Sequence, residues 1–137
     1  MKKSILVIFS FFLTNLAMGQ DFDLSASIER GKSIYSSKCA SCHMADGTGI
    51  RGIYTPLTGA DSLINDKTRL VKSILVGVKG PTEVNGVKYD GEMQSYSLTD
   101  KQVSDVLNYI RNSWGNKGEA ILADEIQSLL TNKNNEN

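Results

Sequence analysis

The chain has 137 residues, the length of one domain, with 22% charged and 40% apolar side chains. Fifteen basic and fifteen acidic residues balance each other, which argues against the strongly basic surface of a nucleic-acid-binding domain. The sequence contains only two cysteines and one histidine, and all three fall within residues 39–43. Any chemistry that needs cysteine or histidine is therefore confined to that stretch.

Residues 1–19 have the pattern of a secretory signal peptide. Two lysines precede an apolar run over residues 5–13, and small residues lead up to Gly19. We expect cleavage before Gln20, which removes two lysines and no acids and leaves a mature net charge of about −2. An uncleaved membrane anchor is the alternative, but the run is shorter than the roughly 20 residues that span a bilayer. We therefore expect a periplasmic or otherwise extracytoplasmic protein with no membrane span after cleavage.

A first helix is predicted over residues 27–38, leading directly into the cysteines. Its expected apolar contacts are Ile28, Ile34 and Tyr35, and a serine at position 25 or 27 can cap its start. Gly31 lies inside this helix, where glycine costs about 1 kcal/mol relative to alanine. A glycine at such a position indicates the close approach of another element.

Residues 39–43 read Cys-Ala-Ser-Cys-His, the spacing of a c-type haem attachment site. Each thiol can add across one vinyl group of the porphyrin, and the residue after the second cysteine then lies under the iron. We therefore predict thioether bonds from Cys39 and Cys42 and axial ligation of the iron by His43. A redox-active dithiol, a zinc site and a disulfide are the alternatives. Zinc is disfavoured because only three ligands are available, too crowded for a closed tetrahedral set.

Three glycines within residues 47–52 predict a loop that passes close to the haem edge. Pro56 follows this loop, and the residue before it is expected to be extended. We predict that the carbonyl of Pro56 accepts the ring N–H of His43, because a ligating histidine needs such a bond to fix its tautomer and raise its basicity. The alternative is that Pro56 only shapes a turn.

A second helix is predicted over residues 66–78, capped by Asn65 or Asp66. Its apolar residues share one helical face, and they are Leu70, Val71, Ile74, Leu75 and Val78. Beyond it, the pair Asn85-Gly86 between short apolar segments predicts a small hairpin with a type I′ turn.

The clearest helix follows Thr99, because Thr99 and Gln102 have the spacing of a capping box. Its buried stripe comprises Val103, Val106, Leu107 and Ile110. The main domain is expected to cover residues 20–117. Residues 118–131 predict an extra amphipathic helix, and residues 132–137 form a polar tail that we expect to fray.

Met93 is the expected second axial ligand, because methionine opposite histidine is the ligation that raises the potential of an electron-transfer haem. Of the four methionines, Met1 and Met18 should leave with the signal, and Met44 adjoins His43 and cannot reach the opposite face of the ring. Met93 remains, 50 residues beyond the histidine in a glycine-flanked loop. The alternatives are an open sixth position or a lysine ligand.

Together these motifs resemble a class I c-type cytochrome over roughly residues 25–116. Residues 111–116 are similar to the end of haem domains found with bacterial dehydrogenases and copper nitrite reductases. The resemblance implies an all-α cytochrome c fold, with three to five helices wrapped around one covalently bound haem c. The first and last helices of such a fold cross, so Gly31 and Tyr35 would meet Val106 and Tyr109. The chain departs from the family at Gln94, where proline is frequent, and in its extension after residue 117.

The resemblance implies a single-haem electron carrier, not an enzyme, whose iron cycles between Fe(III) and Fe(II). Its partners would be a redox-protein donor and acceptor, such as an oxidase, a reductase or a dehydrogenase. A dedicated haem subunit of a larger oxidoreductase is the first alternative. An open-site haem enzyme or gas sensor is the second, and it is disfavoured because no further histidine remains for acid–base chemistry. We therefore expect no catalytic residues.

Overall fold

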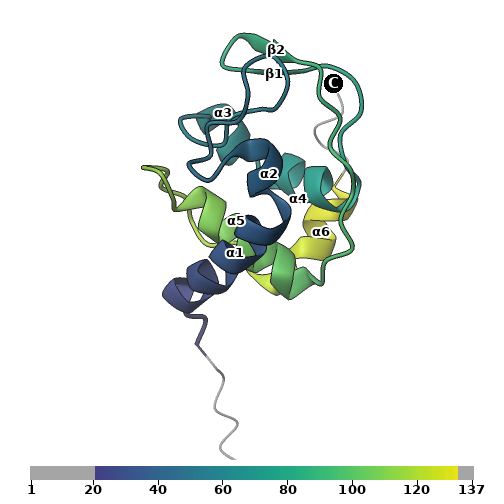
Figure 1. Cartoon of the computed structure of the whole chain (residues 1–137). Coiled ribbons are helices and arrows are strands. Elements are labelled where there is room, and N and C mark those ends of the chain that lie inside the picture. Colours follow the sequence, from purple (N-terminus) through teal and green to yellow (C-terminus); the bar gives the residue numbers. More distant parts are fainter. Residues whose placement is uncertain (1–20, 133–137) are drawn as a thin grey trace, which may run out of the picture.

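The computed structural model describes residues 21–132, so the predicted signal peptide and most of the predicted tail lie outside the described residues. Within this range the chain forms six α-helices and one antiparallel hairpin of strands β1 (Thr82–Val84) and β2 (Val87–Tyr89) (Figure 1). The helices are α1 (Leu24–Lys38), α2 (Ala40–His43), α3 (Asp61–Ile64), α4 (Lys67–Leu75), α5 (Asp100–Arg111) and α6 (Ile126–Thr131). The predicted all-α cytochrome c fold is confirmed. Six helices form where three to five were predicted, because the single turns α2 and α3 add to the main helices α1, α4 and α5.

Helices α1 and α5 cross at Gly31, so the first and the last main helix of the domain pack against each other (Figure 1). A Cβ atom at Gly31 would lie 1.9 Å from the backbone oxygen of Asp105 and 2.8 Å from the Cβ of Tyr109. The ring of Tyr35 packs against the rings of Tyr109 and Trp114, with centroids 5.3 and 5.1 Å apart. The predicted close approach at the glycine is therefore confirmed.

The buried face of α1 differs from the predicted one. Its buried residues are spaced four apart, and they are Ser27, Gly31 and Tyr35. Ile28 and Ile34 are only half-buried. The helix also begins earlier than predicted, because the side chain of Asp23, and not a serine, caps its first turn. Apolar spacing failed as a guide here because this face of α1 meets polar side chains of α5.

A buried polar network joins α1 to α5. The Ser27 hydroxyl donates to Asp105 at 2.6 Å, and Arg30 donates to both oxygens of the same carboxylate at 2.7 and 2.8 Å. The ammonium of Lys101 lies 3.0 Å away. Asp105 is 3% exposed, so these donors compensate for its burial. Burial raises the pKa of Asp105, but the hydrogen bonds from Arg30, Ser27 and Lys101 outweigh that effect and hold the pKa below its ordinary value.

The substitution Asp105→Asn should destabilise the protein by about 3 kcal/mol at neutral pH, because it removes a buried charge that three donors share. The folded pKa lies below the unfolded one, so the carboxylate contributes stability above about pH 4 that is lost as the pH falls through the folded pKa. Guanidinium unfolding at several pH values measures both effects. The difference from wild type should be constant between about pH 5 and 7 and should shrink in more acidic solution. Asp90→Asn, at an exposed aspartate, is the matched control, and equal effects of the two variants would contradict the prediction.

Three local predictions are confirmed in the second half of the chain. Asn85 and Gly86 have φ of 52° and 73°, the positive values that a type I′ turn requires. Thr99 and Gln102 form a capping box at the start of α5. The predicted stripe of α5 is buried throughout, namely Val103, Val106, Leu107 and Ile110.

Helix α4 is shorter than predicted. Asp66 caps it as expected, with its carboxylate accepting from the N–H of Arg69. The helix ends at Leu75 because Gly77 adopts a φ of +86°, which turns the chain away. Val78 was predicted within the helix, but it pairs with Met93 in an isolated antiparallel bridge.

Residues 118–131 do not form the single predicted helix. A 3₁₀ turn, η1, spans Ala123–Glu125, and α6 follows it. Before the turn, the carbonyl of Ile121 accepts from Ser104 at 2.7 Å and from Asn108 at 3.0 Å, and its N–H donates to the Asn108 side chain at 2.8 Å. Side chains of α5 thus bind backbone groups that a helix would have paired. Since Ile121 and Ile126 are fully buried, the extension covers the core beside α4 and α5 (Figure 1).

Candidate haem site

A cavity of about 780 Å³ lies between α2, α4 and the segment around Met93. The predicted residues Cys39, Cys42, His43 and Met93 all line it. Its remaining walls are largely apolar and include Leu57, Leu63, Leu70, Ile74, Leu107 and Ile110. The fold therefore brings all four predicted haem residues to one apolar cavity.

The cysteine–histidine motif forms a single helical turn. The N–H of His43 donates to the carbonyl of Cys39 at 2.9 Å, and this bond closes the turn. Side chains three and four positions apart share one face of a helix, so Cys39, Cys42 and His43 point to the same side. Beyond the turn, the hydroxyl of Tyr35 donates to the carbonyl of Met44 at 2.6 Å, which ties the end of the motif to α1.

The carbonyl of Thr55, and not that of Pro56, accepts the ring N–H of His43. The distance from Nδ1 of the imidazole to the Thr55 oxygen is 2.9 Å. A carbonyl only accepts, so Nδ1 carries the proton and Nε2 is the nitrogen available to a metal. The prediction of Pro56 as the acceptor was wrong by one residue. A proline restricts the residue before it to extended backbone, so the conformation that Pro56 fixes is that of Thr55, whose carbonyl is the acceptor. Pro56 therefore helps to orient the acceptor without supplying it.

The electrostatics of the histidine suit metal ligation. Burial lowers the pKa of His43, and the hydrogen bond to Thr55 only partly opposes that effect. The imidazole is therefore neutral at physiological pH, the state in which it binds a metal.

Met93 is held in place by its backbone. The N–H of Met93 donates to the carbonyl of Val78 at 3.0 Å, and the carbonyl of Met93 accepts from the N–H of Val78 at 2.8 Å. A Cβ atom at Gly77 would lie 2.5 Å from the carbonyl oxygen of Met93, so this close approach requires glycine. Of the two methionines in residues 21–132, only Met93 lines the cavity.

The alternative of a redox-active dithiol does not fit the first cysteine. Such a dithiol uses a thiol of lowered pKa. Burial raises the pKa of Cys39 to about 11, although Lys38 opposes the shift. The thiol is therefore neutral at physiological pH, unlike the reactive thiol of such a dithiol, and it lies half-buried beside the apolar cavity.

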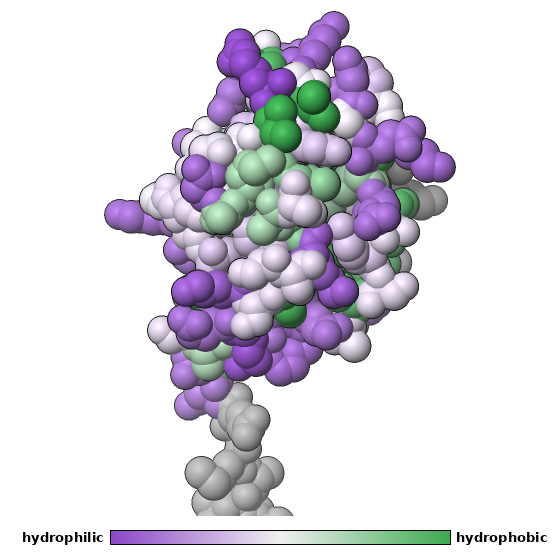
Figure 2. Space-filling view, viewed as in Figure 1, coloured by the Kyte–Doolittle hydropathy of each residue, from purple (hydrophilic) through white to green (hydrophobic). Residues whose placement is uncertain are grey.

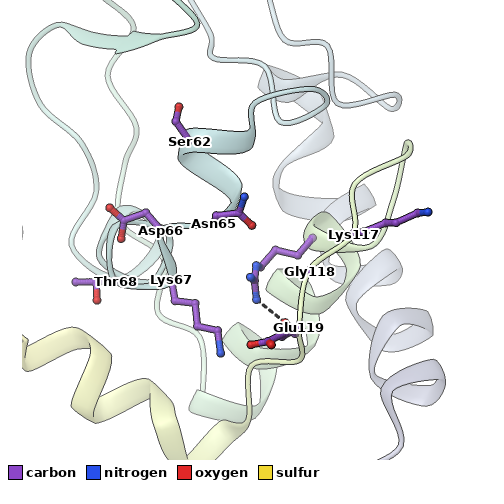
Figure 3. A pocket seen from close by; sticks show the side chains of 9 residues that line it. Ser62, Asn65, Asp66, Lys67, Thr68, Lys117, Gly118 and Glu119 are labelled. Carbon is purple, nitrogen blue, oxygen red and sulfur yellow. Dashed lines mark hydrogen bonds between the residues drawn. The ribbon is translucent and has the colours of Figure 1, made fainter.

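A second hollow, of about 740 Å³, has a different character (Figure 3). Polar and charged residues of the α3–α4 region and of residues 117–119 line it, among them Asn65, Lys67 and Glu119. Arg111 is 3% exposed there and donates to the backbone carbonyls of Ile64 and Glu119. Its guanidinium thus ties the segment after α5 to α3. No cysteine, histidine or methionine lines this hollow, so it is not a haem site.

Several residues that line the first cavity were not singled out from the sequence, among them Thr55, Arg69 and Lys79. Arg69 precedes the apolar residue Leu70 on the predicted helix, but helical spacing alone does not show what that side of the helix borders. The proline that follows Thr55 was the sequence signal that could have identified the Thr55 carbonyl as the acceptor for His43, because it restricts the backbone of Thr55.

The residues of the first cavity fit a haem attached through two thioethers, because a neutral imidazole, two thiols and a methionine thioether share one apolar enclosure. The fold and the site thus define a haem protein of the c type. Residues 28–114 match the family model described as cytochrome c. The chain belongs to the cytochrome c family, so it is an electron-transfer protein that carries haem c covalently and exchanges electrons with redox proteins.

The relatives that the chain matches include a small cytochrome and cytochrome subunits of dehydrogenases. The chain is 38% identical over 113 residues to cytochrome c-552 of Thermus thermophilus, covering 75% of this chain and 86% of the relative. It is 33% identical to the cytochrome c subunit of the quinone alcohol dehydrogenase of Gluconobacter oxydans, and 34% identical to the gluconate 2-dehydrogenase cytochrome c subunit of Pantoea cypripedii. Those matches cover 74% of this chain but only 22% and 24% of the two subunits. Among residues 21–132, no helix has the length and apolar character needed to cross a membrane.

Proposed function

We propose that this protein is a freely diffusing, exported electron carrier with His43 and Met93 as the axial ligands of its haem iron. Cys39 and Cys42 form the thioether bonds. The observation that carries the proposal is that Met93 and the cysteine–histidine motif line one cavity, although 50 residues separate the two ligands. Haem c, when bound, supplies an iron that takes up and releases one electron.

The protein keeps the surroundings of the iron constant during this exchange. His43 is fixed through Thr55, and Met93 is fixed by its paired backbone bonds with Val78. Side chains fixed in this way would hold the iron in both oxidation states, so that little reorganisation would accompany each transfer. The apolar walls exclude water, which together with a thioether ligand favours the reduced state.

Exposed apolar residues at the cavity suit brief docking to redox partners. Val76 and Ile53 are 66% and 49% exposed, and both line the cavity. Figure 2 shows apolar surface gathered on the face that carries α2, below the hairpin, with hydrophilic residues around it. A small patch of this kind supports a weak, fast-dissociating complex with an oxidase, a reductase or a dehydrogenase.

The extension after residue 117 does not favour a dedicated oxidoreductase subunit. Ile121 and Ile126 are fully buried in the protein's own core, so this segment is accounted for without a partner. A free carrier should elute from a native extract as a monomer in size-exclusion chromatography.

Export predicts that the mature protein begins at Gln20, which intact mass measurement checks.

Visible spectra test the ligand assignment directly. The purified protein should show sharp bands when reduced with dithionite, a weak near-infrared sulfur-to-iron band when oxidised, and no response to carbon monoxide. A shift with carbon monoxide would reveal an open iron and favour the enzyme or gas-sensor alternative. No haem absorbance, in a host able to attach haem, would overturn the proposal.

The double substitution Cys39→Ser, Cys42→Ser should abolish covalent haem attachment and rigid tertiary structure. Without the porphyrin, the apolar walls formed by α4 and α5 have little to pack against. Near- and far-ultraviolet circular dichroism with thermal melting measures the loss. Ser41→Ala, at an exposed position within the motif, should keep both haem and structure. Full helicity and a sharp melting transition in the double variant would contradict the prediction.

A further inference from the structure

We propose that the hydroxyl of Tyr35 is a positioning group for the haem site. It holds the strained backbone of Met44, and through the loop that follows it keeps the carbonyl of Thr55 on the ring of His43. The inference rests on the proposed ligation of the iron by His43. Tyr35 does not line the cavity, so it acts through this loop and not on the haem itself.

Met44 has a backbone conformation that residues with a side chain rarely adopt. Its φ is 64° and its ψ is 161°, a combination found almost exclusively in glycine and kept elsewhere only where surrounding contacts enforce it. Unlike the positive φ of Asn85, this one does not belong to a hairpin turn. The side chain of Met44 does not line the cavity, so this position contributes its backbone and not its thioether.

The contact that enforces the conformation is buried. The hydroxyl of Tyr35 donates to the carbonyl of Met44 at 2.6 Å, and Tyr35 is 1% exposed. Burial raises the pKa of Tyr35, so the phenol keeps its proton and donates at physiological pH. The ring packs against Tyr109 and Trp114, which leaves the hydroxyl little freedom to move.

Gly47 passes the constraint on to the segment around Thr55. Its N–H donates to the carbonyl of Met44 at 3.2 Å, so the loop turns back directly after the strained residue. The carbonyl of Gly47 accepts from the N–H of Leu57 at 2.7 Å and from the N–H of Thr58 at 3.1 Å. The position of the Met44 carbonyl therefore influences where the backbone just beyond Thr55 lies.

Gly49 contacts both partners of the histidine hydrogen bond. Its N–H donates to the backbone carbonyl of His43 at 3.0 Å. A Cβ atom at Gly49 would lie 2.6 Å from the carbonyl oxygen of Thr55, so the loop packs directly against the acceptor. Nδ1 of His43 lies 2.9 Å from that oxygen. A shift of the loop therefore changes the hydrogen bond that fixes the imidazole.

The strength of this hydrogen bond affects the reduction potential in a known direction. An imidazole that donates a strong hydrogen bond is a more basic ligand. A more basic ligand stabilises Fe(III) relative to Fe(II) and so lowers the potential. Loosening the loop should therefore raise the potential, whereas loss of the Met93 thioether should lower it. The direction of the change distinguishes a weakened histidine hydrogen bond from a disrupted site.

The holoprotein variant Tyr35→Phe tests the proposal, because it removes the hydroxyl and keeps the ring. Its reduction potential should rise by up to about 59 mV, which corresponds to a tenfold lower preference for Fe(III). The Nδ1 proton of His43 should also exchange faster with deuterium, as followed by proton NMR of the reduced protein. Tyr109→Phe is the matched control and should change neither value, since it removes a hydroxyl from the same aromatic cluster that does not bind Met44.

Two double variants test whether the hydroxyl acts through the strained backbone. Glycine adopts the conformation of Met44 without strain, so Tyr35→Phe, Met44→Gly should return both values toward the wild type. Tyr35→Phe, Met44→Ala should not, because alanine is strained there as methionine is. Equal behaviour of the two double variants would overturn the proposal, and this comparison alone decides it if Tyr35→Phe does not retain its haem.

A purely structural role of Tyr35 gives a different result. The variant Tyr35→Phe would then unfold at a lower guanidinium concentration but keep the wild-type potential and proton exchange, and this outcome would also overturn the proposal. Carbon monoxide binding by the wild type, or a wild type without haem, would instead overturn the proposed function. The two failures are therefore distinguishable.

Discussion

Replacing Met93 by alanine should open the iron to carbon monoxide, abolish the near-infrared sulfur-to-iron band and lower the reduction potential. The thioether is the ligand that raises the potential of such a haem. Axial ligands set potentials over a range of about 0.8 V, so we expect a fall of a few tenths of a volt. Spectroelectrochemistry of the oxidised and reduced protein, with and without carbon monoxide, measures all three effects.

Met44→Ala is the matched control for this experiment. Met44 lies next to His43 but does not line the cavity, so its removal should leave the spectrum and the potential unchanged. If Met93→Ala still excludes carbon monoxide, the sixth ligand is a different residue. Lys38 and Lys79 are the lysines that line the cavity and would be examined next.

Replacing Gly31 by alanine should destabilise the holoprotein by about 3 kcal/mol or more, although alanine is the better helix former. Helix propensity alone predicts a gain of about 1 kcal/mol. The added methyl group would lie 1.9 Å from the backbone oxygen of Asp105, so α1 and α5 must separate. Separation also strains the hydrogen bonds from Ser27 and Arg30 to Asp105. A decrease in the free energy of unfolding would therefore show that the steric contact dominates, and an increase would show that helix propensity does.

Guanidinium unfolding, monitored by circular dichroism, measures this change in the free energy of unfolding. Glu29→Ala on the exposed face of the same helix is the control, and it should change stability by less than about 0.5 kcal/mol. A stabilised Gly31→Ala variant would show that the crossing has room for a side chain, contrary to the packing described above.

Elements defined by neighbouring residues were predicted well from the sequence. The capping box at Thr99 and Gln102, the Asn85-Gly86 turn and the stripe of α5 all depend on contacts within a few positions. The position of Gly31 also indicated a close contact. In contrast, the ends of α4 and of the C-terminal extension were misjudged, because backbone groups there bond to distant parts of the chain, such as Met93 and Asn108.

The sequence by itself determined the chemistry of this protein. Haem attachment needs two thiols and an imidazole within one helical turn, and residues 39–43 contain them whatever the rest of the fold does. The tertiary structure alone decided the acceptor for His43, the polar face of α1 and the position of Arg69 at the cavity. Each of these depends on which surfaces meet across the fold, and residue spacing along one element specifies a face but not the partner of that face.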